Sequence, residues 1–105
     1  MLPVLDEKRA EIADICRGFG VVRLDVFGSA ATGAFDPDRS DVDFIVEFPD
    51  GYDFGPWLKR YFDLNDALET LLGRSVDLVM SKAPSLADPF FAREVNRTRR
   101  PVYAA

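Results

Sequence analysis

The sequence predicts an α+β fold of two layers, in which a small mixed β-sheet carries helices packed on one face. Segments with the residue pattern of strands alternate with segments of helical periodicity, in the order α-β-α-β-α-β-α. The chain has 105 residues, a length that suits one compact domain. Hydrophobic residues make up 48% of them and charged residues 30%, a balance typical of a folded domain. We therefore expect residues 1–105 to form a single domain.

Three segments have the pattern of helices that pack on a core. Residues 5–19 place apolar side chains at helical spacing, and Gly20 supplies a stop signal after them. Residues 56–72 carry a second apolar stripe with charged residues on the other sides. A last helix is predicted over residues 88–97, because Asp88-Pro89 puts a capping residue and a proline at its start.

The segments between these helices have the pattern of strands and turns. Strands are predicted over residues 21–27, 43–48 and 75–80. A short helical turn with a loop is expected at residues 30–40, and a loop at residues 81–87. Residues 101–103 are compatible with a short strand at the edge of the sheet.

Composition excludes several kinds of active site. The chain has no histidine, which removes Ser-His-Asp and Cys-His catalysis and leaves oxygen ligands for any metal. Cys16 is the single cysteine, so a disulfide within the chain and a cysteine-based zinc site are excluded, and we expect its side chain to be buried in the core. The first residues become charged too early for a secretory signal, and we expect a cytoplasmic protein that does not cross a membrane.

The formal charge of −5 disfavours general binding to nucleic acids, which depends on an excess of lysine and arginine. A basic cluster near the C-terminus is compatible with a binding role. We favour the interpretation that it is a solvated helix end whose cations complement the helix dipole. Its members are Arg93, Arg97, Arg99 and Arg100.

Three carboxylates and a glycine-serine turn suggest phosphoryl-transfer chemistry. Asp41 and Asp43 are two residues apart at the start of a strand, so their side chains project to the same side. Asp77 lies in the third predicted strand and completes a three-carboxylate cluster if the two strands are neighbours. Carboxylates are the ligands that Mg²⁺ prefers, and Gly28-Ser29 at the end of the first strand suits the approach of a phosphate.

Each of these features also has a purely structural explanation. Gly28-Ser29 alone is more often an ordinary turn, and Asp41 and Asp43 alone are more often solvated carboxylates. Asp77 is different, because a charge inside the apolar stretch VDLV needs a partner or a metal. The three features together, in this order and on these elements, favour the functional interpretation.

Read together, these motifs resemble those of the DNA polymerase β-like nucleotidyltransferases, in particular the minimal, MNT-type members. Phe27-Gly28-Ser29 and Asp41-Val42-Asp43-Phe44 match the family signature, and Val76-Asp77-Leu78 matches the later strand with the third carboxylate. The resemblance covers residues 21–80 and implies the nucleotidyltransferase fold.

The resemblance assigns a role to each of these residues. Asp41 and Asp43 bind the metals that hold a triphosphate, and Asp77 completes the metal site on the acceptor side. Two Mg²⁺ ions, with Mn²⁺ as a substitute, are the implied cofactors. The implied reaction transfers AMP from ATP to an acceptor hydroxyl. The residues expected to bind the nucleotide are Gly28, Ser29, Gly33 and Ser40.

Two positions depart from the family pattern. Many members carry a basic residue just before the second glycine of the turn, where this chain has Thr32 before Gly33. The spacer that follows is slightly long around Asp38-Arg39. Arg39 is a candidate for the missing phosphate-side cation, although a solvated loop arginine is the simpler interpretation.

The resemblance also implies a partner. Minimal members often accompany a small helical HEPN protein in a toxin-antitoxin pair. An alternative function is therefore that of an antitoxin-like binding module, which neutralises its partner by contact without catalysis. A third interpretation, an acidic regulatory domain unrelated to nucleotides, leaves the order of the three motifs as coincidence. The three carboxylates favour the enzyme.

Overall fold

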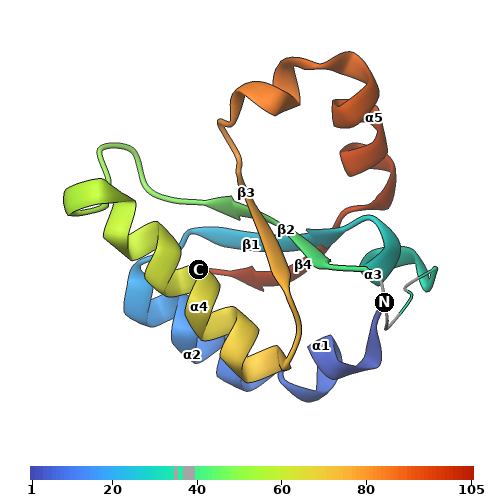
Figure 1. Ribbon diagram of the computed structural model, residues 1–105, viewed down its shortest axis with the longest axis horizontal. Helices are drawn as coiled ribbons and strands as arrows, with labels where there is room; N and C mark the ends of the chain where they lie inside the picture. The colour runs from blue at the N-terminus through green and yellow to red at the C-terminus, as the bar shows by residue number, and fades with distance from the viewer. Residues whose placement is uncertain (35, 37–39) are drawn as a thin grey trace.

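The computed structural model describes residues 1–34, 36 and 40–105, and in this part of the chain four strands form one sheet (Figure 1). The strands are β1 (Arg23–Phe27), β2 (Val42–Glu47), β3 (Val76–Met80) and β4 (Arg100–Ala104). The α-helices are α1 (Pro3–Glu7), α2 (Arg9–Phe19), α3 (Ser29–Thr32), α4 (Lys59–Leu72) and α5 (Pro89–Thr98). Two short 3-10 helices, η1 (Pro56–Leu58) and η2 (Pro84–Ala87), precede α4 and α5.

The sheet is mixed, with the strand order β3-β2-β1-β4. β1 is antiparallel to both of its neighbours, β2 and β4, whereas β2 and β3 are parallel. A parallel pair needs a long crossover connection, and α4 provides it. The predicted α+β fold with a mixed sheet is confirmed. β4, which the sequence left as a short edge strand, pairs with β1 along its length.

The long helices α2 and α4 pack against one face of the sheet. Because side chains alternate along a strand, every second residue of β1, β2 and β3 enters the same core. The fully buried side chains there include Leu24, Val26, Phe44 and Val46 from the strands, Ile12 and Cys16 from α2, and Leu64 and Leu68 from α4. Burial raises the pKa of the Cys16 thiol to about 12, so this cysteine is a core residue, as expected.

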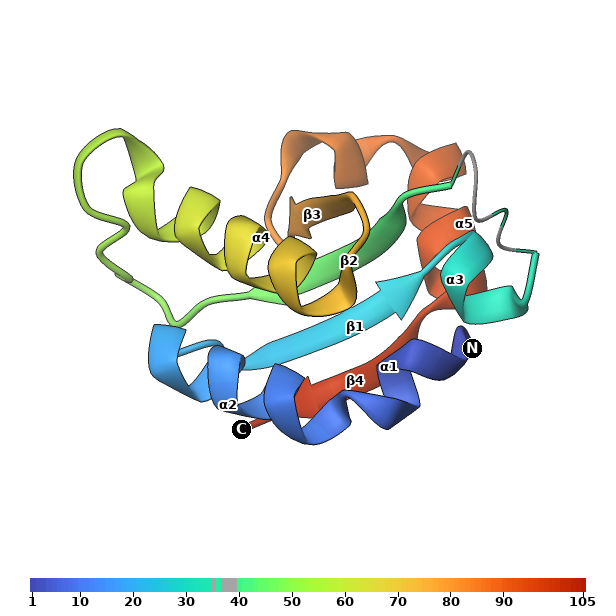
Figure 2. The ribbon, with the colours of Figure 1, turned by 60° about the horizontal axis from the view of Figure 1, so that its bottom comes forward.

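A second, smaller cluster lies on the other face, where α5 packs. It is built from Phe27 of β1, Ile45 of β2 and Val95 of α5. The rings of Phe27 and Phe91 meet edge to face, with their centroids 5.9 Å apart. In Figure 2, α5 lies behind the end of β1 while α4 passes in front of β2. α5 therefore covers one end of this face, so the helices lie on both faces of the sheet and not on one as expected.

Two predicted helices are interrupted. Residues 5–19 do not form one helix, because Lys8 at the junction has φ −101° and ψ 13° and separates α1 from α2. The predicted helix over residues 56–72 begins at Lys59, because Trp57 and Leu58 both have positive φ angles, 57° and 56°. Positive φ is costly for residues with a side chain, and apolar periodicity gives no sign of it.

A buried ion pair connects the C-terminal end of α5 to β1. Asp25 is 0% exposed, and its Oδ1 and Oδ2 accept hydrogen bonds from Nε of Arg23 (2.9 Å) and Nε of Arg99 (2.8 Å). Arg99 caps the C-terminus of α5, so the pair fastens this helix and the start of β4 to the central strand. Of the basic cluster, Arg97 instead pairs with Glu94 on the exposed side of α5.

None of the described helices has the length and apolarity that a membrane crossing requires.

We expect Arg99→Met to lower the free energy of unfolding by about 3 kcal/mol, because it leaves a fully buried carboxylate with one partner instead of two. Arg97→Met is the matched control, since it removes the exposed pair with Glu94 and should change stability little. Urea denaturation of the three proteins measures the difference. Equal stability of the two variants would show that the buried pair does not hold α5.

Candidate active site

A strained glycine turn connects β1 to α3. Gly28 has φ 69° and ψ −146°, a conformation that residues with a side chain rarely adopt. Its N–H donates to Oγ1 of Thr98 at 2.9 Å, and its carbonyl oxygen accepts from the N–H groups of Ala31 and Thr32. The first residue of α3 is Ser29, whose hydroxyl has no hydrogen-bond partner in the described part of the chain. The turn therefore presents this hydroxyl while holding the Gly28 peptide in place.

The carboxylate of Asp43 lies against this turn. Asp43 is paired in register with Phe27 of β1, one residue before Gly28. A β-carbon added to Gly28 would lie 2.9 Å from Oδ2 of Asp43, closer than real β-carbon contacts come. The positive φ favours glycine at this position, and any β-carbon added there would also force the Asp43 carboxylate to move.

Asp77 lies beside Asp43 on the neighbouring strand. The parallel pairing of β2 with β3 puts the two residues directly opposite each other, so their side chains project to the same face of the sheet. This is the face on which α5 packs, and it is opposite to α2 and α4. Asp77 is exposed, whereas Asp43 is partly buried. The residues on either side of Asp77 in β3, Val76 and Leu78, are buried in the main core.

Two hydrogen bonds from α4 hold β3 in this register. Oε2 of Glu69 accepts from the N–H of Val76 at 2.9 Å, just before Asp77. The hydroxyl of Tyr61 donates to the carbonyl oxygen of Leu78, just after it. Because β3 is the outer strand of the sheet, α4 supplies the support that a further strand would give.

The remaining predicted site residues lie on the segment that connects β1 to β2. Asp41 is exposed and lies immediately before β2, two residues from Asp43. Ser40 closes the preceding loop, since its hydroxyl accepts from the N–H of Asp36 at 3.1 Å. Gly33 ends α3 with φ 86°. Arg39, the candidate phosphate-side cation, lies outside the described residues.

Electrostatic repulsion is concentrated on Asp43. Burial, followed by the negative charges of Asp77 and Asp41, raises the pKa of the Asp43 carboxyl from 3.8 to about 6. Burial, followed by the negative charge of Asp77, raises the pKa of the Tyr61 hydroxyl. A cation bound between these carboxylates would relieve the repulsion.

The donor atoms suit a hard divalent cation. Asp43 and Asp77 offer carboxylate oxygens on adjacent strands, and the charge of Asp41 also acts on Asp43. Over residues 1–34, 36 and 40–105, no three acidic, histidine or cysteine side chains lie close enough to enclose a metal ion by themselves. The expected cluster of three carboxylates is therefore not assembled in this part of the chain, and the pairing of β2 with β3 brings together two of them, Asp43 and Asp77.

Thr98 and Asp25 were not singled out from the sequence, and Arg99 was expected to be a solvated helix-end cation rather than the partner of a buried carboxylate. Thr98, 1% exposed, binds the Gly28 N–H, and Arg99 binds Asp25. Asp25 carries a signal that was available, because an aspartate in the apolar stretch RLDVF needs a partner as much as Asp77 does. No local signal in the sequence points to Thr98, because its hydrogen-bond partner lies 70 residues away in the chain.

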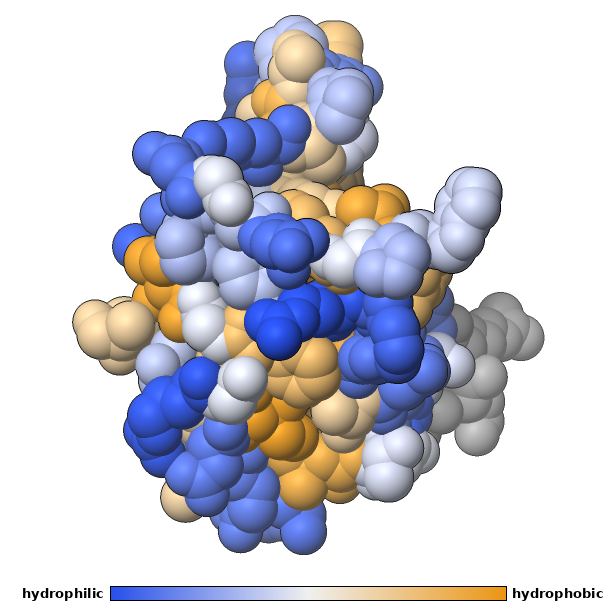
Figure 3. Space-filling model, turned by 90° about the vertical axis from the view of Figure 1, so that its left-hand side faces the viewer, coloured by the Kyte–Doolittle hydropathy of each residue, from blue (hydrophilic) through white to orange (hydrophobic). Residues whose placement is uncertain are grey.

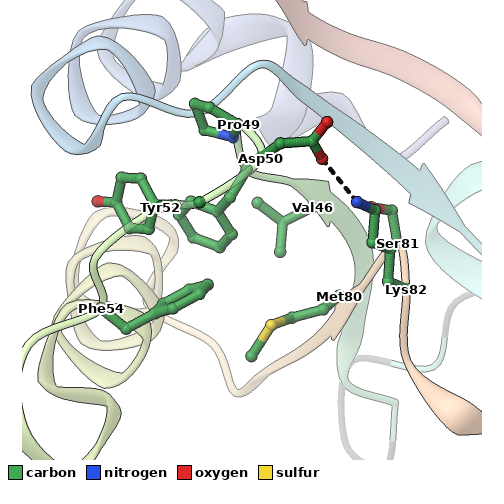
Figure 4. Close-up of a pocket in the computed structure, with 10 residues that line it drawn as sticks. Val46, Pro49, Asp50, Tyr52, Phe54, Met80, Ser81 and Lys82 are labelled. Carbon is green, nitrogen blue, oxygen red and sulfur yellow. Dashed lines mark hydrogen bonds and ion pairs between the residues drawn. The ribbon is translucent and has the colours of Figure 1, made fainter.

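A separate hollow of ≈270 Å³ lies at the other ends of β2 and β3 (Figure 4). Val46 and Met80 form its floor, and Phe54 and Tyr52 line one side. Lys82 and Asp50 pair across its mouth at 2.7 Å. Val46 and Asp43 are three residues apart in β2 and so face opposite sides of the sheet. This hollow is therefore not part of the carboxylate site.

The geometry of the site agrees with a comparison of the chain with protein families. Residues 9–101 match the model of the nucleotidyltransferase domain family. The chain belongs to this family. The predicted class of enzyme, a nucleotidyltransferase, is thereby confirmed at the level of the family.

Similar sequences are named for protein adenylylation. The chain is 43% identical over 65 residues to the protein adenylyltransferase MntA of Thermococcus cleftensis, a match that covers 62% of this chain and 61% of that protein. It is 34% identical over 94 residues to MJ0128 of Methanocaldococcus jannaschii, assigned to the same adenylyltransferase class, covering 82% of this chain and 89% of that protein. The chain thus spans less than two thirds of the length of MntA and most of that of MJ0128.

Solved structures share the fold. A minimal nucleotidyltransferase superposes with a TM-score of 0.71 at 35% identity, covering 96% of both chains. An MNT antitoxin in complex with a tri-AMPylated HEPN toxin of Shewanella oneidensis superposes with a TM-score of 0.65 at 18% identity, covering 96% of this chain and 73% of that one. The second likeness establishes the nucleotidyltransferase fold and no more.

We expect Asp43→Asn to stabilise the metal-free nucleotidyltransferase domain at about pH 8. The pKa of Asp43 is about 6 in the folded protein and 3.8 in the unfolded chain, so the protonated carboxyl favours the folded state at low pH. This stability is fully present below pH 3.8 and is lost as the pH rises through about 6, whereas Asn does not ionise. Because Asp43 is half exposed, the gain in unfolding free energy should be about 1 kcal/mol, less than the whole shift implies. This gain in unfolding free energy should become smaller as the pH falls towards about 4.

Thermal melts across this pH range, in the presence of a chelator, measure the effect. Asp66→Asn, on the exposed side of α4, controls for the general benefit of removing one negative charge. A variant at Asp43 that is less stable than the parent at about pH 8 would contradict the repulsion.

Proposed function

We propose that this domain is a Mg²⁺-dependent nucleotidyltransferase that transfers AMP from ATP to a hydroxyl group of a partner protein. The observation that most supports this proposal is the arrangement of Asp43, Asp77 and Gly28. Two carboxylates lie side by side in register, and one of them fills the space left by a glycine at the phosphate-binding turn. The names of the relatives, protein adenylyltransferases, support AMP as the transferred group.

In the proposed reaction the acceptor oxygen attacks the α-phosphorus of ATP in line. The new phosphorus–oxygen bond forms as the bond to pyrophosphate breaks, and the proton of the acceptor hydroxyl passes to solvent water. Bound divalent ions, when present, neutralise the developing negative charge and align the reacting oxygens. The role of the chain is to hold ligands and substrate in place.

Each site residue has one task in this scheme. Asp41 and Asp43 hold the ions on the triphosphate side, and Asp77 holds the ion on the acceptor side. With a pKa of about 6, Asp43 is mostly ionised at neutral pH and available as a ligand. Ser29 donates its free hydroxyl to a phosphate oxygen. Gly28 admits the phosphates close to the backbone, and Gly33 and Ser40 complete the turn and loop around them.

A protein partner is supported by an apolar surface at the start of α4. Trp57 is 95% exposed, and Leu58 and Phe62 beside it are 43% and 55% exposed. Figure 3 looks at the end of the molecule that carries this segment, where apolar areas are interrupted by hydrophilic ones. Exposed apolar residues grouped in one segment are typical of protein interaction sites. By analogy with the Shewanella complex, we propose a HEPN-type protein as the partner.

We expect Mg²⁺ with ATP to raise the melting temperature, because a ligand that binds only the native state stabilises it, by about 2.7 kcal/mol at a hundredfold excess over its dissociation constant. The double variant Asp41→Asn/Asp43→Asn should lose this rise, since it lacks two of the proposed ligands. Differential scanning fluorimetry with Mg²⁺ alone, ATP alone and both measures it. An equal rise in the variant and the parent would refute the assignment of these carboxylates.

We expect Asp77→Asn to lower the transfer rate by at least about 100-fold while the affinity for Mg²⁺–ATP stays within a few-fold of the parent. Asn keeps the shape of the side chain and removes its charge on the acceptor side alone. Transfer from α-labelled ATP to a HEPN-type protein gives the rate, and calorimetry with a non-hydrolysable analogue gives the affinity. Transfer at the parental rate would make Asp77 a structural residue.

The contact-only antitoxin is the alternative that these measurements separate from the enzyme. Its distinguishing result is a parent protein that neutralises its HEPN-type partner and transfers no AMP to it. The exposed surface around Trp57 is compatible with both functions, whereas the placement of Asp43 opposite Asp77 favours the enzyme.

A further inference from the structure

The end of α5 is bonded directly to the phosphate-binding turn. The hydroxyl of Thr98 accepts the N–H of Gly28 at 2.9 Å and donates to the carbonyl oxygen of Glu94 at 2.8 Å. Thr98 is 1% exposed, so water does not compete for this bond. One side chain thus joins the last turn of a helix to a backbone group 70 residues earlier in the chain.

The position of the Gly28 peptide affects both the Asp43 carboxylate and Ser29 in the proposed site. Its α-carbon faces Oδ2 of Asp43 without space for a β-carbon, so a shift of the turn changes where the Asp43 carboxylate can lie. Its carbonyl oxygen accepts the N–H groups that open α3, so the same shift moves Ser29. The positive φ at Gly28 is a conformation that needs support from its surroundings.

We propose that Thr98 is a positioning residue that sets the distance between the Asp43 carboxylate and the Gly28-Ser29 turn, and so between the metal ligand and the triphosphate. This role rests on the proposed nucleotidyltransferase function. It does not require Thr98 to touch the nucleotide, because it acts through the Gly28 N–H.

The hydroxyl of Thr98 can be removed without detaching α5. The adjacent Arg99 is bound to the buried Asp25, and Val95 is 1% exposed in the cluster with Phe27 and Ile45. These contacts keep the helix on the sheet when the bond to Gly28 is lost. Thr98→Val has the same shape as threonine and leaves the Gly28 N–H without its acceptor.

Three variants of the full chain test the proposal. Thr98→Val removes the bond, and Thr98→Ser restores a hydroxyl at the same place. Asp88→Ala is the matched control for stability, since it removes the cap that accepts the N–H of Phe90 at the far end of α5. The dissociation constant for Mg²⁺ with a non-hydrolysable ATP analogue is measured by calorimetry, and exchange of the Gly28 amide proton by NMR.

We expect Thr98→Val to weaken binding of the Mg²⁺-analogue complex about tenfold and to speed exchange of the Gly28 amide proton, because one buried hydrogen bond is lost. Thr98→Ser should restore both values to within a few-fold. Asp88→Ala should lower the melting temperature while leaving both unchanged. If the effect came from a general loosening of α5, Asp88→Ala would change the dissociation constant and the exchange rate in the same way as Thr98→Val.

Two results would overturn the proposal, and they are distinguishable. If the parent binds the complex and Thr98→Val binds it equally well, Thr98 has no positioning role although the proposed function stands. If the parent does not bind Mg²⁺ with the analogue at all, the proposed function fails, and the positioning role fails with it.

Discussion

The close approach of the Asp43 carboxylate to Gly28 is the constraint on which the rest of the site depends. It demands a residue without a side chain at position 28, a positive φ there and a fixed separation between β1 and β2. The antiparallel register, with Phe27 opposite Asp43, supplies the separation. Carboxylate and turn are therefore brought together by the central strands, the most rigid part of a sheet.

The rest of the sheet extends this arrangement in two directions. On one side, the parallel pairing with β3 adds Asp77, and Glu69 and Tyr61 of α4 secure that outer strand. On the other side, α5 secures the turn through Thr98. Burial and the charges of Asp77 and Asp41 together raise the pKa of Asp43, so the surrounding contacts must offset the cost of keeping this carboxylate ionised in the metal-free site.

Much of the fold could be predicted from the sequence, because strand alternation, helix periodicity and glycine signals are local. Two kinds of information were not local. Asp25 and Asp77 both interrupt apolar strands, but β1 is central and β3 is at the edge, so Asp25 is fully buried between arginines and Asp77 is exposed. Strand order decides this difference, and it cannot be derived from either segment. The positive φ angles at Trp57 and Leu58 were hidden by a regular apolar stripe.

The distribution of arginines bears on how the site handles a triphosphate. The position before Gly33, basic in many members of the family, is Thr32, and several arginines of the described chain are engaged elsewhere. Arg23 and Arg99 neutralise Asp25, and Arg97 pairs with Glu94. In the proposed reaction, this favours a larger share of the phosphate charge being neutralised by divalent ions than in family members with a basic turn. The acidic character of the site is consistent with this, because a carboxylate cluster that repels itself gains most from binding cations.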